Sequence, residues 1–366
     1  MIVNRMNGES DADFAKRVAS ARTAVGFWNS PADWMNPSPV SSEDRAFCPT
    51  GDGGGVDNSC GGGEGSVASK HTSTKSKSSK EPKSSSVAKE VKDIERLIKS
   101  GAHPDKISNA VRDAIVGKSG WFSGYTPGKV SPAEMCKALG VKVQNVDQLD
   151  ELMSKSWDHE RRGIADVIAQ IAVASSDDPS GLKGAPIRID TASSAAKDTG
   201  LAAWELNSTS AFYMPSTDTI HILAGTVDMT PGAIEAMYES GYDSTPEFSH
   251  VVIHENAHRE HFLAAGKAAG LTPPGKGSSM KEKEKFSREL NRFVYERLRK
   301  ALTADKEWLG RCEEKVKKVS FYATTDPFEV VAEYTAAVRL GYADNDRDLD
   351  RLCREMYAPV PKRARS

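Results

Sequence analysis

Apolar residues recur every three or four positions from Val87 to Ile98, which is the spacing of one face of an α-helix. Residues 131–134 read Ser-Pro-Ala-Glu, a capping box with proline at the first helical position, so they predict a further helix start. Other segments with helical spacing are 107–115, 149–156 and 164–174. The pattern therefore predicts a small all-helical domain over residues 87–180.

After residue 180, short strand signals precede long helical ones. The apolar runs 212–214 and 219–223 flank the turn-forming sequence Pro-Ser-Thr-Asp and predict a β-hairpin. A short alternating run stands at 187–189. Helical patterns follow at 231–241, 247–266, 281–303, 306–318 and 327–340. We therefore expect an α+β domain with a small antiparallel sheet over residues 181–360, and a basic tail at 361–366.

The first 86 residues lack such periodicity. Prolines and glycine runs separate their few aromatic residues, and residues 66–89 are rich in Ser and Lys. This composition buries too little apolar surface to offset the entropy of ordering the chain. We therefore expect a disordered arm over residues 1–86. Its basic stretch would be a solvated linker or would make a weak contact with nucleic acid or another acidic surface.

Composition and charge narrow the class of protein. The 366 residues carry 49 Lys+Arg and 51 Asp+Glu, a balance that argues against a dedicated nucleic-acid binder. Five cysteines are too few for a disulfide scaffold. The longest apolar stretch is far shorter than the ~20 residues that cross a bilayer, and the N-terminus lacks the apolar core of a secretory signal. We expect a soluble protein with no membrane partner, either cytoplasmic or exported without a Sec signal.

Five of the eight histidines lie between residues 221 and 261. Residues 254–258 read His-Glu-Asn-Ala-His, an HExxH pattern within a predicted helix. Both imidazoles share one helix face and can reach a single metal ion, with Glu255 placed to act on a water as general base. Two histidines at this spacing also arise by chance on a charged surface helix. The third ligand therefore decides between the two interpretations.

A catalytic zinc site needs three protein ligands and one open position. The metzincin arrangement would place a third histidine at position 264, which is alanine. Residues 326–333 read Asp-Pro-Phe-Glu-Val-Val-Ala-Glu, and the Asp-Pro pair predicts a helix start. Glu329 and Glu333 then lie one turn apart on an apolar helix. One carboxylate can bind zinc while the other accepts a hydrogen bond from a ligating histidine.

HENAH followed about 70 residues later by YATTDPFEVVAE resembles the gluzincin metallopeptidases, and most closely their lethal-factor-type branch. That branch has HExxH, then a tyrosine seven residues before a glutamate in a segment reading E-hydrophobic-hydrophobic-A-E. The resemblance implies a zincin-like fold and the zinc ligands His254, His258 and Glu329. It also implies that Glu255 is the general base and that Tyr322 stabilises the oxyanion or protonates the leaving group.

The same resemblance implies supporting roles around the zinc. Glu333 would hydrogen-bond a ligating histidine, and the hairpin 212–223 would supply the edge strand that binds an extended protein or peptide substrate. His250 lies one turn before His254. Since successive positions four apart drift by about 40° around a helix, three such ligands fit one straight helix poorly. We therefore expect His250 to support the site from outside the ligand set.

The Gly-rich segment from Phe47 to Cys60 is similar to short peptides of phage head-morphogenesis and neighbouring virion proteins. This resemblance implies a phage, prophage or toxin-like origin, with virion proteins as partners and a virion-associated location as a further alternative to the two above. The sequence thus supports a zinc-dependent endopeptidase, for which the stretch 61–86 is long enough to be a substrate in the same chain. The alternative is a non-catalytic virion-associated or interaction protein that uses the zincin-like fold as a scaffold.

Overall fold

The computed structural model describes most of the chain from residue 84 onward. Nearly all of the expected arm, and with it the Gly-rich segment 47–60, lies outside the described residues. The last three residues of that expected arm, 84–86, are described and belong to a helix. The described ranges are 84–117, 119–120, 124–125, 127–199, 206, 209–225, 229–275 and 277–364.

The helical spacing of residues 87–180 produces helices, as predicted. The capping box at Ser131 forms, because its hydroxyl accepts from the N–H of Glu134 while the Glu134 carboxylate accepts from the N–H of Ser131. A two-residue antiparallel ladder, β1 (Ser119–Gly120) with β2 (Gly124–Tyr125), interrupts the helices, so the prediction of an all-helical domain is wrong at this point. The helices are α2 (Ser84–Lys99), α3 (Pro104–Ile115), α4 (Pro132–Ala138), η2 (Val146–Gln148), α5 (Leu149–Lys155) and α6 (Asp158–Asp177).

Three strands form a sheet in the order β3-β5-β4, namely β3 (Ile187–Asp190), β5 (Thr219–Leu223) and β4 (Ala211–Met214). The hairpin β4–β5 is antiparallel as predicted, but β3 pairs with β5 in parallel. The prediction of a purely antiparallel sheet is therefore wrong. The chain leaves β3 through α7 (Ala192–Thr199), a helix that the pattern did not predict. This crossover lets the hairpin return with β5 running in the direction of β3.

After β5, every described element is a helix. The helix that carries HExxH begins at His250, three residues later than predicted. The Thr245 hydroxyl accepts from the N–H of Glu247 and contacts the His250 ring, but residues 248–249 form a turn before the helix. The last helix, α14, was not predicted. The elements are α9 (Pro231–Glu239), α10 (His250–Ala269), α11 (Met280–Ala304), α12 (Lys306–Val319), η3 (Tyr322–Thr324), α13 (Pro327–Leu340) and α14 (Arg347–Glu355).

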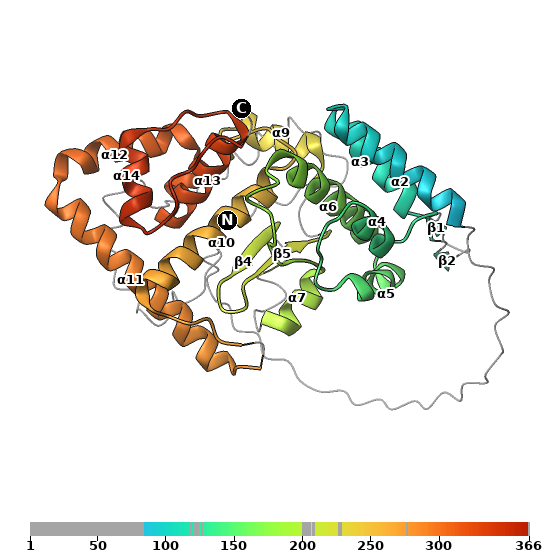
Figure 1. Ribbon diagram of the computed structural model, residues 1–366, viewed down its shortest axis with the longest axis horizontal. Helices are drawn as coiled ribbons and strands as arrows, with labels where there is room; N and C mark the ends of the chain where they lie inside the picture. The colour runs from blue at the N-terminus through green and yellow to red at the C-terminus, as the bar shows by residue number, and fades with distance from the viewer. Residues whose placement is uncertain are drawn as a thin grey trace, which may run out of the picture.

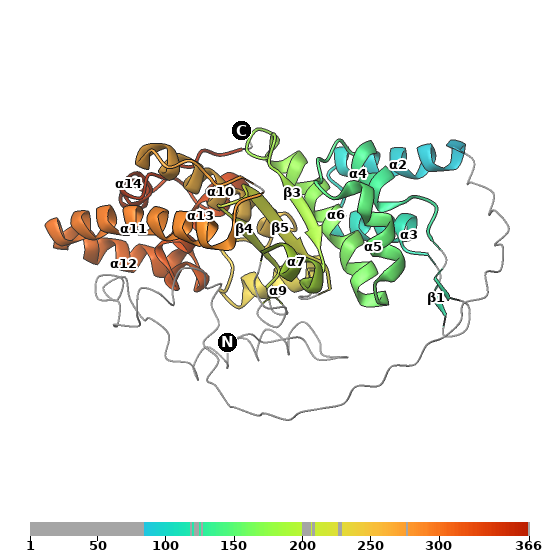
Figure 2. The ribbon, with the colours of Figure 1, turned by 90° about the horizontal axis from the view of Figure 1, so that it is seen from below.

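The helix α10 lies between two hydrophobic cores. Figures 1 and 2 show helices α2–α6 on one side of the sheet and helices α11–α14 on the other, with α10 near the middle. Val252 near its start packs in a core shared by α6 and the inner face of the sheet. Ala265 near its end packs in a second core with Trp308 and the C-terminal helices. None of the described helices is both long enough and apolar enough to cross a lipid bilayer.

His261 links α10 to the C-terminal end of the fold. It is fully buried, its Nε2 donates to the carbonyl oxygen of Met356 at 2.8 Å, and its ring stacks on Phe328. Burial lowers the pKa of His261 to about 3. This imidazole is therefore neutral at physiological pH and contributes to packing between α10 and the segment after α14.

A first prediction concerns the close approach of α6 to the end of β5. A Cβ at Gly163 would lie 2.6 Å from the backbone nitrogen of Gly225. We expect Gly163→Ala to lower the free energy of unfolding by about 1–3 kcal/mol, because the two backbones must separate. Gly310→Ala is the control: nothing lies within 4 Å of its Cβ, and it should raise that energy by about 0.5–1 kcal/mol. Urea unfolding followed by circular dichroism measures the unfolding free energy of both variants. An equal increase in that energy for Gly163→Ala and Gly310→Ala would contradict the close packing at Gly163.

A second prediction follows from the low pKa of His261. Between its ordinary pKa and about 3, the unfolded chain binds a proton at this imidazole and the folded chain does not, so folding weakens as the pH falls. His261→Gln retains a donor for Met356 without the titration. From about pH 7 to about pH 5, the wild type should lose about 2 kcal/mol more unfolding free energy than the variant. If urea titrations show that the wild type and the variant lose the same unfolding free energy over this pH range, His261 is not held neutral in the folded protein.

Candidate metal centre

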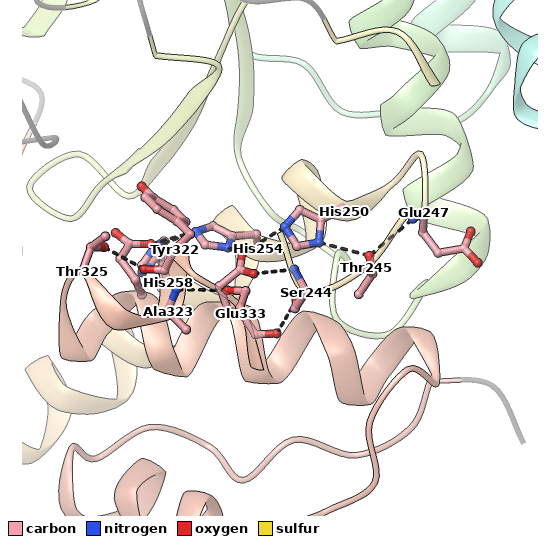
Figure 3. A network of polar contacts seen from close by, with 12 residues as sticks. Ser244, Thr245, Glu247, His250, His254, His258, Tyr322, Ala323, Thr325 and Glu333 are labelled. Carbon is pink, nitrogen blue, oxygen red and sulfur yellow. Dashed lines mark hydrogen bonds and ion pairs between the residues drawn. The ribbon is translucent and has the colours of Figure 1, made fainter. Parts of the chain in front are cut away.

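Helices α10 and α13 lie side by side and present polar side chains to each other (Figure 3). The start of α13 is the one predicted: the Asp326 carboxylate accepts from the N–H of Phe328, and proline occupies the first position. Helical spacing then directs Glu329 and Glu333 toward α10. The histidines of the HExxH pattern face them from the opposite helix.

The first group of converging atoms is His254 Nε2, His258 Nε2 and Glu329 Oε2. The two nitrogens are 3.1 Å apart, and the carboxylate oxygen lies 3.1 Å from the His254 nitrogen and 3.2 Å from the His258 nitrogen. All three side chains are buried or half-buried. Three such atoms this close together can hold one metal ion.

The second group consists of His250, His254 and Glu333, and it too can hold a metal ion. Glu333 Oε1 lies 3.0 Å from His250 Nε2 and 2.7 Å from His254 Nδ1. Its other oxygen accepts from the N–H of Ser244 at 2.8 Å. These contacts already satisfy the Glu333 carboxylate through ordinary hydrogen bonds (Figure 3).

The two groups differ in what they leave unsatisfied. If the Nδ1 of His254 carries the proton that Glu333 accepts, its Nε2 presents a lone pair toward His258 and the Glu329 carboxylate. The Nδ1 of His258 and the Oε2 of Glu255 are buried without a hydrogen-bond partner among the described residues. Of the described atoms at the candidate centre, those that lack partners thus belong to His258 and Glu255, beside the first group.

The buried charged groups at the centre shift one another's pKa. Burial raises the pKa of Glu329, but the neighbouring His258 and His254 lower it by a larger amount. The pKa therefore falls to about 2. Burial likewise raises the pKa of Glu333, and His250 and His254 bring it well below its ordinary value. In the opposite sense, burial lowers the pKa of His254, yet both carboxylates raise it well above 6.5. Two ionised carboxylates therefore stand at the site, each paired with histidines.

Glu255 and Tyr322 lie beside the first group. Burial raises the pKa of Glu255, with nearby histidines and a backbone hydrogen bond from Tyr213 acting in the opposite direction. A raised pKa suits a group that accepts a proton near neutral pH. The Tyr322 ring stacks on His254 with centroids 5.7 Å apart. Burial and then the Glu329 carboxylate raise the pKa of Tyr322 well above 10, so its phenol keeps its proton and remains a donor.

The hairpin β4–β5 is held against α10 by a contact that the sequence analysis missed. Arg259, next to His258, donates through Nε and Nη2 to the two oxygens of Asp218, at 2.8 and 3.1 Å. Asp218 occupies the hairpin turn with a φ of 47°, and the Tyr213 hydroxyl also donates to it. The turn sequence predicted the hairpin, but nothing local pairs Asp218 with an arginine 41 residues later.

The edge of β4 away from β5 runs beside this site. Leu223 donates to the carbonyl of Ser210, and hydrogen bonding alternates along an antiparallel pair, so the peptide groups of Tyr213 face away from β5. Within the described residues, β4 has a neighbouring strand on one side only. Peptide binding along this edge remains a prediction.

All seven residues that the sequence analysis placed in or around the site therefore lie together: Glu255, Tyr322, His254, His258, Glu329, Glu333 and His250. His221, the first histidine of the cluster along the chain, lies apart from the site and contacts the buried Asp190 at 2.9 Å. No family model, curated protein or solved structure matches the chain. Its function has to be inferred from the chemistry of these residues.

Proposed function

We propose that the chain is a zinc-dependent endopeptidase whose zinc ligands are His254, His258 and Glu329. The observation that carries this proposal is the triangle of ligand atoms with sides of 3.1, 3.1 and 3.2 Å. In a tetrahedral site with zinc bonds of about 2.0–2.1 Å, ligand atoms lie about 3.3 Å apart. Two imidazoles and one carboxylate are also a common catalytic zinc ligand set, which leaves a position open.

The surrounding residues would perform the remaining steps. A zinc ion at this site would supply a Lewis acid and lower the pKa of water to about 7. Glu255 would take a proton from the attacking water and pass it to the leaving amine. Tyr322 would donate a hydrogen bond to the oxyanion that develops on the peptide carbonyl. Glu333, supported by His250, would hold the His254 tautomer in which Nε2 carries the lone pair.

The ligand assignment predicts the order in which variants lose zinc. His258→Ala removes a ligand and should weaken zinc binding more than Glu333→Gln, which should cost about 10–100-fold as a change beside a ligand. His250→Ala acts only through Glu333 and should cost less than about tenfold. Competition with a chromogenic chelator, after EDTA treatment, measures these affinities. If His250→Ala loses zinc while His258→Ala retains it, the ion is bound by the second group, which consists of His250, His254 and Glu333.

The catalytic assignment predicts that Glu255→Gln separates binding from turnover. The variant should bind zinc like the wild type, because Glu255 is not a ligand, and its kcat/KM on an unfolded protein substrate should fall by about 10²–10⁴-fold. Mass spectrometry of the products and metal analysis of the same preparations give both readouts. Equal hydrolysis by both proteins would exclude Glu255 as the base. No hydrolysis by the zinc-loaded wild type would favour the scaffold alternative.

A further inference from the structure

Tyr322 stands on a short connection and not on one of the long helices. It begins η3, a single 3₁₀ turn between α12 and α13. Its carbonyl accepts from the N–H and the hydroxyl of Thr325, at 3.0 and 2.7 Å, and these bonds close the turn. A functional side chain on so short an element needs neighbouring residues to keep it in one position.

The loop before α10 supplies this support. The N–H of Tyr322 donates to the carbonyl of Tyr242 at 3.1 Å, and the N–H of Phe321 donates to the carbonyl of Gly241 at 2.8 Å. The Tyr242 ring also stacks on the Tyr322 ring, with centroids 5.2 Å apart and an angle of 19° between the ring planes. Tyr242 therefore holds both the backbone and the side chain of Tyr322.

The end of α9 presents Tyr242 to η3. Gly241 has a φ of 73°, in the left-handed region that favours glycine. Its N–H donates to the carbonyl of Tyr238 at 2.7 Å, and the N–H of Tyr242 donates to the carbonyl of Met237 at 2.9 Å. This pair of bonds is a Schellman cap, which ends the helix and fixes the path of the chain after it. The carbonyls of Gly241 and Tyr242 are thus set in place for the residues of η3.

The same loop holds a second part of the centre. Ser244 donates to Glu333 through its N–H, at 2.8 Å, and the Thr245 hydroxyl contacts the His250 ring at 3.1 Å (Figure 3). Glu333 in turn contacts His254, the ring on which Tyr322 stacks. The segment 241–245 therefore sets the position of Tyr322 relative to the proposed ligands.

We propose that Tyr242 is a positioning residue that fixes Tyr322 for the reaction. The inference rests on the proposed endopeptidase function and extends it to a residue outside the ligand set. Stacking restricts the Tyr322 side chain, so its hydroxyl is already placed when the oxyanion forms. Misplacement of such a group by about 1 Å can cost about 100-fold in rate. Because the hydrogen bond is made mainly in the transition state, the loss is expected in kcat and not in KM.

The test removes the Tyr242 ring and measures kcat and KM on a peptide that spans a cut site of the unfolded protein substrate. In the zinc-loaded protein, Tyr242→Ala should lower kcat by about 10- to 100-fold and leave KM and zinc affinity unchanged. Tyr242→Phe keeps the ring and should retain most of the kcat. Tyr238→Ala is the matched control, because this exposed tyrosine lies four residues earlier and packs on Tyr342. It should retain the wild-type kcat.

A second substitution shows whether Tyr242 acts through Tyr322. Tyr322→Phe removes the hydroxyl, so Tyr242→Ala added to it should lower kcat no further. The same loss from Tyr242→Ala in both backgrounds, or a parallel loss of zinc affinity, would overturn the assignment. If Tyr242→Ala does not fold, Tyr242→Leu replaces it, since leucine fills much of the space without a planar ring.

The outcomes separate this assignment from the proposed function. An unchanged kcat in Tyr242→Ala, or the same loss in Tyr238→Ala, would overturn the role of Tyr242 and leave the endopeptidase proposal intact. Full activity of Tyr322→Phe would overturn the roles of both tyrosines. No cleavage by the zinc-loaded wild type would overturn the endopeptidase proposal together with this inference.

Discussion

The buried carboxylate of Glu333 is the contact on which the centre depends. It is fully buried, and a buried charge is costly unless hydrogen bonds and opposite charges compensate it. Glu333 meets this requirement through His250, His254 and the N–H of Ser244, while its own carbonyl accepts from the Ser244 hydroxyl. These contacts fix α13 against α10. Glu329, one turn earlier on the same helix, is thereby set against the HExxH histidines.

Ion pairs hold α10 in place on its other sides. Arg259 secures the hairpin at Asp218, beside the proposed ligands. Arg339, near the end of α13, pairs with Glu260 of α10 and with Asp178 just after α6. Arg339 is mostly buried, so its pairs are less screened by solvent than those on a surface helix. The helix that carries the motif is therefore connected to the sheet, to α13 and to the N-terminal helices by charged side chains.

Local signals predicted much of this fold, and long-range pairing accounts for what they missed. The Asp-Pro start of α13 and the one-turn spacing of Glu329 and Glu333 are properties of a few neighbouring residues, and the structure forms both. The parallel pairing of β3 with β5 depends on a crossover through α7, which no short segment encodes. The contact of Glu333 with Ser244 joins residues 89 apart. Periodicity cannot reveal such a partner, because it reports only which face of a helix is buried.

Helix geometry explains how one helix serves three purposes at once. His250, His254, His258, Phe262 and Gly266 follow one another at intervals of four along α10. Each step turns the side chain by about 40° around the axis, so the row winds across the helix surface. Its first member meets Glu333, the middle two meet Glu329, and the last two line an apolar cavity together with residues of the hairpin and α11. The drift that makes His250 a poor third ligand is the same drift that carries the row from the polar centre to the apolar surface of α10 at Phe262 and Gly266.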